Sequence, residues 1–264
     1  MDYVQPIPLS GDVLKQRIFS PLAYATIRNA NVMAIAPVEA ARFAGHYPIA
    51  WRKQNDSFEL VVVRSLLADG RGHAPGTQTT LAFIPVLARC YPFLYDPALP
   101  PQAGKPKFVD TAIADQPNDI GAPIALADGR PSKATLQRIA QLDAAAPSFA
   151  LSATIAATLA KAELFEPWPL HFENIEGQTL DVDGLWIVRQ NVVETGGLAP
   201  LLRAHGIAAA DLVSLHRISL YRAGMLLAQS RAALKIEAAA NVQSLVQADQ
   251  PAFLAEPADA GAAS

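Results

Sequence analysis

Five histidines are the side chains of this sequence best suited to proton transfer or metal binding near neutral pH. They are His46, His73, His171, His205 and His216. No His-Glu-x-x-His motif occurs, and no two histidines have the spacing of metal ligands on a helix. His171 and Glu173 would share one face of a strand, but such pairs are typical of protein surfaces. The sequence therefore predicts no metal site.

His216 leaves two interpretations open. It lies on the apolar face of the last long helix that the sequence predicts, and Ser219 follows three residues later. A role in proton transfer would require a pocket that opens onto this face. The alternative is a core histidine that is hydrogen-bonded to a backbone carbonyl or a carboxylate. We favour the core histidine.

Two other segments resemble parts of known sites, and each departs from the required pattern. Segment 70–76 is rich in glycine but lacks the Gly-x-Gly-x-x-Gly spacing of a dinucleotide-binding turn. Asp181 begins a run similar to a calcium loop, but Trp186 and Val192 occupy the positions that need glycine and glutamate. A loop and a tight turn account for these two segments.

Nucleophilic catalysis also lacks a signature in this sequence. No Gly-x-Ser-x-Gly elbow and no Gly-Lys-Ser/Thr phosphate loop is present. Cys90, the only cysteine, could have a lowered thiol pKa beside Arg89, but a lone cysteine is more often a small buried residue. We therefore predict no catalytic residue and no cofactor.

A set of aromatic, basic and histidine side chains is the remaining candidate for ligand or partner binding. Aromatic residues and arginine are enriched where proteins bind partners or extended ligands. Each of them could instead pack in the core. The candidates are His46, Tyr47, Trp51, Arg89, Tyr91, Trp186 and His216.

Composition restricts the class of protein. Of the 264 residues, 51% are hydrophobic and 17% are charged, so most of the chain should fold into a core. The formal net charge is -3 and the basic residues are scattered, which argues against nucleic-acid binding. The N-terminal residues do not resemble a secretory signal, and no apolar stretch approaches the roughly 20 residues that span a bilayer. We expect a cytoplasmic protein that does not span a membrane.

The elements of the first half are predicted by apolar runs and turn residues. Strands are expected at 32–35, 49–51 and 58–67, with hairpin residues at 54–57 between the last two. Pro37 should begin a short helix that ends at Gly45. The run 60–63 does not alternate, so that strand should be buried on both faces.

The second half should be richer in helix. Ser132 is the expected N-cap of a helix to about 145, and a second helix should follow Pro147 to about 162. A three-stranded meander is predicted over 170–174, 178–182 and 185–189. Helices are expected over 198–205 and from 208 to about 235. In the last of these, leucines including Leu212 and Leu226 should form the apolar face, with Arg217 pointing away from it.

Together these elements predict an α+β fold with a mostly antiparallel sheet, packed helices and a long C-terminal amphipathic helix. We expect one domain over residues 1–237. It should include a Pro- and Gly-rich surface excursion at 97–131. The Ala-rich tail, 238–264, should be disordered.

Four blocks of the sequence resemble the SapC family of bacterial proteins: 37–49, 84–93, 183–188 and 212–231. Their order and spacing agree with the family from about residue 3 to about 234. The departures are Cys90, where a basic residue is common, the Pro-rich segment 98–106 and the longer tail. The resemblance implies surface-layer or outer-membrane functions, since family members are often encoded beside TonB-dependent receptors and flavin-dependent tryptophan-halogenase-like proteins in proteobacteria. It implies no catalytic residue.

From these observations we predict a non-catalytic accessory protein that binds a protein partner, either of an outer-membrane receptor system or a halogenase-like flavoprotein. An enzyme that modifies a peptide or a sugar-derived substrate is the alternative. That alternative requires His46, Arg89 and His216 to line one solvent-reached cleft. A structural component of the surface layer ranks last.

Overall fold

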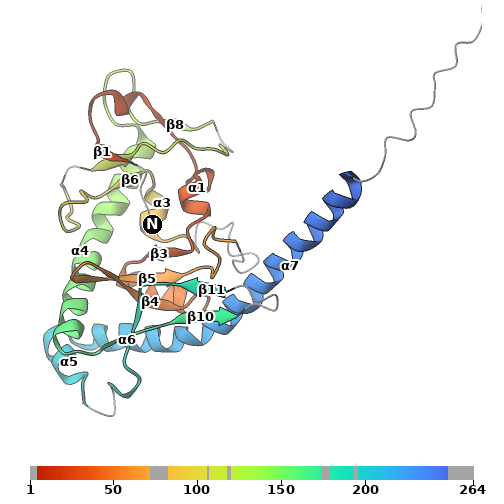
Figure 1. The fold of residues 1–264 in the computed structure, drawn as a ribbon. Helices are drawn as coiled ribbons and strands as arrows, with labels where there is room; N and C mark the ends of the chain where they lie inside the picture. The colour runs from red at the N-terminus through yellow and green to blue at the C-terminus, as the bar shows by residue number, and fades with distance from the viewer. Residues whose placement is uncertain are drawn as a thin grey trace, which may run out of the picture.

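A five-stranded antiparallel sheet forms the centre of the structure, a computed structural model that describes residues 5–71, 83–105, 107–117, 120–173, 179–192 and 196–248. Neighbouring strands in this sheet come from both halves of the chain (Figure 1). In spatial order they are β3 (Val32–Ala34), β5 (Ser57–Val63), β4 (Ile49–Gln54), β12 (Leu185–Val188) and β9 (Phe165–Pro167).

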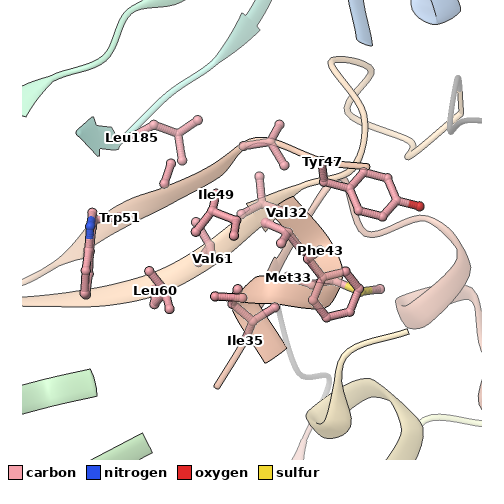
Figure 2. Close-up of a cluster of buried hydrophobic side chains, with 14 of the residues drawn as sticks. Val32, Met33, Ile35, Phe43, Tyr47, Ile49, Trp51, Leu60, Val61 and Leu185 are labelled. Atoms are coloured by element: carbon pink, nitrogen blue, oxygen red, sulfur yellow. The ribbon is translucent and has the colours of Figure 1, made fainter. Parts of the chain in front are cut away.

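The β4–β5 hairpin follows its local sequence signals. Gln54 pairs with Ser57, and Asn55 adopts the left-handed conformation that asparagine tolerates better than most residues. The side chains of residues 60–63 are all buried, so the expectation of a strand covered on both faces is confirmed. Figure 2 shows part of this core, with Trp51 and Tyr47 at opposite ends of the cluster.

Helices cover the sheet. The helix α4 (Lys133–Lys161) packs against β5, and α6 (Ile207–Ser219) packs against β4. The 3-10 turn η3 (Pro37–Glu39) leads into α2 (Ala40–Ala44), which contacts α6. Pro37 therefore begins a helical segment as predicted, because its fixed φ suits the first turn of a helix.

The prediction of two helices separated at Pro147 is wrong, because α4 runs through Pro147 without interruption. Proline removes one backbone hydrogen bond, but Ala146 before it and Ile155 after it are both buried. Packing on both sides of the proline thus stabilises one continuous helix. Ser132 is the N-cap as predicted, since its Oγ accepts a hydrogen bond from the Thr135 amide (3.2 Å).

By length and composition alone, α4 is long and apolar enough to cross a membrane. The core helix of a folded domain meets the same criterion, and α4 packs on β5, α3 (Val86–Cys90) and α5 (Ala199–His205).

The predicted three-stranded meander is also wrong. Strand β10 (Leu170–Glu173) pairs with β11 (Thr179–Val182), whereas β12 pairs with β4 and β9. The chain therefore forms one long hairpin that bends where β9 passes into β10 and β11 into β12. Between the pairs Pro167–Trp186 and Leu170–Val182, one arm contains two residues (168–169) and the other contains three (183–185). The extra residue on the second arm forms a β-bulge at the bend.

A second, smaller core lies between the N-terminal region and α4. Strands β1 (Pro6–Pro8), β7 (Phe108–Asp110) and β6 (Phe93–Leu94) form one sheet, and β2 (Arg17–Ile18) pairs with β8 (Ala122–Pro123). The short helix η1 (Gly11–Lys15) connects β1 to β2, whereas η2 (Pro21–Ala23) and α1 (Ala25–Arg28) lead from β2 to β3 of the central sheet. Val109 and Ile124 of the segment 97–131 are buried here, so that segment contributes to the core as well as to the surface.

The C-terminal helices extend further than the sequence predicted. After η5 (Gln190–Val192) and α5, the helix α6 continues through the 3-10 turn η6 (Leu220–Arg222) into α7 (Ala223–Ala248). Leu212 and Leu226 are buried as expected. The far end of α7 projects away from the rest of the structure (Figure 1). The helix thus occupies the first part of the predicted tail, and residues 249–264 lie outside the described residues.

Candidate functional site

Four of the seven predicted binding residues have no exposed surface. Tyr47, Trp51, Tyr91 and His216 are each 0% exposed. Trp51 contacts Phe165 edge-on, with ring centroids 5.4 Å apart. In this conformation the four side chains are core residues and cannot touch a ligand or a partner.

The other three predicted residues are partly exposed and belong to three different segments. His46 packs edge-on against Phe83 (4.5 Å between ring centroids) next to α2. Arg89 belongs to α3, and Trp186 belongs to β12 in the bent hairpin. His216 is buried away from solvent, so His46, Arg89 and His216 do not line a shared solvent-reached cleft. The enzyme hypothesis loses the set of residues on which it depended.

His216 instead occupies a gap in the central sheet. Strands β4 and β12 pair at Arg52–Leu185 and Trp51–Trp186, and the same register would next bond Ile49 to Val188. That ladder bond is replaced by the imidazole. The Val188 amide donates to Nε2 (3.1 Å), and Nδ1–H donates to the Ile49 carbonyl (2.7 Å).

Two more side chains of α6 complete this arrangement. The Ile49 amide donates to the Ser219 hydroxyl (2.8 Å), which in turn donates to the His216 carbonyl (2.6 Å). Nη1 of Arg217 donates to the Val188 carbonyl (3.2 Å), so Arg217 reaches back to the sheet although we expected it to point away. All four backbone groups of the Ile49–Val188 pair are therefore bonded to α6, and we call this set of five residues the α6 seam.

The polar groups of the α6 seam stabilise the fold and are not arranged for a reaction. Because burial disfavours the charged imidazolium, and the nearby Arg217 charge adds to this, the pKa of His216 is lowered to about 4. The ring is thus neutral at physiological pH, with one nitrogen donating and the other accepting. Both nitrogens are occupied by backbone groups, which leaves neither available for proton transfer to a ligand.

A buried carboxylate, which we did not identify from the sequence, connects the two Tyr-Pro blocks, namely 37–49 with Tyr47-Pro48 and 84–93 with Tyr91-Pro92. Glu39 is 7% exposed and accepts hydrogen bonds from the amides of Ala36 (3.1 Å) and Val86 (3.0 Å). Arg42 lies 2.5 Å from its carboxylate and Arg89 lies 4.0 Å from it. Burial raises the pKa of Glu39, and these bonds and cations oppose that shift. Glu39 therefore fixes α2 against α3.

Neither a metal site nor a reactive thiol is found among the described residues. No group of three His, Cys, Asp or Glu side chains in that part of the chain is placed to hold a metal ion. Burial raises the pKa of the Cys90 thiol to about 12, although the nearby Arg89 and Arg138 charges oppose this. The thiol is therefore protonated, and the possibility of a lowered pKa is wrong.

The outward face of the last helices carries an apolar surface that we also missed. Its exposed fractions range from 41% at Met225 to 88% at Tyr221. Ile218, Tyr221 and Met225 are spaced by three and four residues, which places them on one side of a helix. We call this surface the outer stripe, and it consists of Ile207, Ile218, Tyr221, Met225 and Ile236.

A groove of about 470 Å³ lies beside the centre of the outer stripe. Ile187 and Leu220 contribute apolar surface, and Glu166, Gln190 and Arg217 contribute polar groups. Ile218 and Tyr221 of the stripe form one wall. The centre of the stripe (Ile218, Tyr221 and Met225) and the groove together form a surface with the features of a protein-binding site, an apolar centre with polar groups at its edge.

Fold and surface together define an α+β protein. Side chains of its C-terminal helix α6 complete the hydrogen bonding between β4 and β12, and the outward side of the last helices exposes apolar residues. The chain belongs to the SapC family, because the SapC family model matches residues 15–222. The matched region contains the two Tyr-Pro blocks, the whole α6 seam and the centre of the outer stripe. Neither a curated protein nor a solved structure matches this chain.

Proposed function

We propose that this SapC-family protein is a non-catalytic accessory protein that binds a protein partner of a bacterial outer-membrane uptake system through its outer stripe. The observation that carries the proposal is the exposed apolar surface along α6 and α7. Soluble proteins rarely cluster large exposed apolar side chains on one side of a helix, as Ile218, Tyr221 and Met225 are, unless something covers them. The implied link between SapC proteins and TonB-dependent receptors supplies the class of partner.

Charge around the outer stripe indicates the chemistry of that partner. Arg217, Arg222 and Lys235 flank the stripe, as do Asp211 and Glu237, and Glu166 lines the groove, so charges of both signs border the apolar centre. An amphipathic helix with an apolar face and edges that carry both signs of charge would complement this arrangement. The groove beside Tyr221 could receive one of its large apolar side chains.

A second copy of the chain fits the outer stripe less well. The stripe is symmetric about the peptide bond between Tyr221 and Arg222 in η6, since Ile207 and Ile236 lie equally far from it, as do Ile218 and Met225. A two-fold pairing of two copies would therefore centre on η6. It would bring Arg222 of both copies together, and like charges facing each other weaken an interface.

Affinity capture from the native bacterium tests this proposal. The wild-type chain should recover a TonB-dependent receptor component or the halogenase-like flavoprotein encoded with it. Ile218→Asp should reduce that recovery by about tenfold or more, because a charge placed in an apolar interface must lose its hydration. Ile113→Asp is the matched control, since Ile113 is also an exposed isoleucine (89% exposed) but lies outside the stripe.

Three outcomes would count against the proposal. The first is recovery of neither kind of protein by the wild-type chain. The second is equal recovery by the Ile218→Asp and Ile113→Asp variants. The third is concentration-dependent self-association in analytical ultracentrifugation that Ile218→Asp abolishes, which would assign the stripe to a second copy.

A further inference from the structure

The bend of the long hairpin forms a second cleft, separate from the outer stripe. It has a volume of about 310 Å³ and is lined by residues 167–171 of one arm and 181–186 of the other. Its position coincides with the β-bulge, where the extra residue changes the direction of both arms. Bulges commonly redirect side chains next to binding sites. We call this feature the bent-hairpin cleft.

Rigid apolar groups form one part of the bent-hairpin cleft. Trp168 lies between Pro167 and Pro169, and its amide donates to the Leu185 carbonyl (2.8 Å), which fixes the backbone at the bend. Trp186 packs edge-on against Phe58, with ring centroids 5.5 Å apart. Both indoles are partly exposed and line the cleft. Flat, preorganised surfaces of this kind bind ligands at a low cost in conformational entropy.

Polar groups form the other part. His171 and Asp181 face each other across the β10–β11 pair, and His171 Nδ1–H donates to the Asp181 carboxylate (2.6 Å). This bond leaves Nε2 of the imidazole and the second carboxylate oxygen of Asp181 available to a ligand. Asp183 adds another carboxylate at the turn. The cleft thus offers several acceptors beside two aromatic faces.

Local charge restricts the ligand. The two carboxylates are opposed by the Lys53 ammonium, which lies 5.5 Å from the centre of the Trp186 ring. Lys53 therefore already occupies a cation–π position on Trp186, and Asp181 is already bonded to His171. Neither a strongly cationic nor an anionic ligand suits this balance. A neutral molecule with one apolar face and several hydroxyl donors does.

We propose that the bent-hairpin cleft binds a pyranose unit of a carbohydrate, with its C–H face against the Trp168 indole, its edge beside Trp186, and its hydroxyls donating to Asp181, Asp183 and His171. An apolar pocket with a few converging polar groups is the usual form of a small-molecule site. This inference goes beyond the proposed partner binding and is independent of it, because no residue lines both the cleft and the outer stripe.

Tryptophan fluorescence provides the test. Trp168 and Trp186 line the cleft, whereas Trp51, the third tryptophan, is fully buried and serves as an internal reference. Hexasaccharides of α-linked glucose, β-linked glucose, β-linked xylose and β-linked N-acetylglucosamine are titrated into the full-length chain. At least one should protect the exposed indoles from acrylamide quenching in a saturable manner, and calorimetry should give the same dissociation constant.

Asp181→Asn should weaken that binding by roughly tenfold, the usual effect of losing one charged hydrogen-bond acceptor. Asp128→Asn is the matched control. Asp128 is about as exposed as Asp181 (47% against 44%), and it also pairs with a base at 2.6 Å, namely Arg130, far from the cleft. The control should bind the sugar as the wild-type chain does.

Three results would overturn the inference. One is the absence of saturable binding by all four hexasaccharides. Another is unchanged binding by Asp181→Asn, which would place the sugar elsewhere. The third is saturable binding of spermidine in place of the sugars, which would assign the cleft to cations. Loss of partner capture in Ile218→Asp leaves each of these results unaffected, so the two proposals can fail separately.

Discussion

The C-terminal end of α6 and the adjoining η6 together reverse the usual distribution of polar and apolar residues on a surface helix. On the inward face, the polar residues His216 and Ser219 are 0% exposed, whereas on the outward face Ile218 and Tyr221 are 63% and 88% exposed. A polar side chain can be buried at little net cost when each of its groups is hydrogen-bonded. The inward face meets that condition, and its polarity therefore serves the fold. The outward face has no such internal explanation, which is why we assign it to a partner.

Among the changes that test this comparison, removal of the His216 imidazole should have the largest effect on stability. His216→Ala leaves the Ile49 carbonyl and the Val188 amide without their partner and creates a cavity between β4 and β12. We expect a loss of about 4 kcal/mol in the free energy of unfolding, which can be measured by urea denaturation. His171→Ala, at an exposed histidine, is the control and should change stability by less than about 0.5 kcal/mol. Equal losses in both variants would show that the seam is not structural.

Acid should weaken the seam next most strongly. The pKa of His216 is about 4 in the folded chain and about 6.5 when unfolded, so the unfolded state binds more protons between these values. The stabilisation is fully present above pH 6.5 and is lost as the pH falls towards 4. It amounts to about 3 kcal/mol. Urea midpoints measured over this range should fall for the wild-type chain, and His216→Gln should lack this part of the dependence. An identical pH profile in the variant would contradict the assignment.

Changes to the outward face should have the smallest effect on stability. Tyr221→Asp removes a side chain that is 88% exposed, so the free energy of unfolding should change by no more than about 0.5 kcal/mol. The same variant should lose partner capture, because the apolar centre of the outer stripe is removed. Thermal melts and the capture experiment together separate a binding residue from a structural one. A melting temperature that falls as far as that of His216→Ala would show that Tyr221 supports the fold instead.

Features with a local cause could be predicted from the sequence. The hairpin at residues 54–57, the N-cap at Ser132 and the helix end at Gly206 depend on residues within one turn of each other. The α+β class followed from the sum of such features. Pro147 was misread because a local rule, the breaking of helices by proline, was outweighed by packing on both sides of α4.

The α6 seam and the pairing of β12 could not be predicted in the same way. His216 and Ile49 are 167 positions apart in the chain, and no local signal tells which strand a buried histidine will reach. The core role favoured for His216 is confirmed, but its place within the β-ladder required the structure. The outer stripe had a visible signal in the spacing of Ile218, Tyr221 and Met225. We missed it because the leucines of the same helix accounted for one apolar face.

The imidazole between β4 and β12 also affects when the fold can be completed during synthesis. Strand β4 is made early and β12 late, yet their last pair of residues bonds only through side chains that follow both strands. The growing chain can therefore form the β4–β5 hairpin at once, but the Ile49–Val188 position between the two halves can be completed only after residue 219 has been added. Until then, the Ile49 edge stays accessible to other chains or to a chaperone, so the C-terminal third of the protein controls when its N-terminal sheet becomes protected.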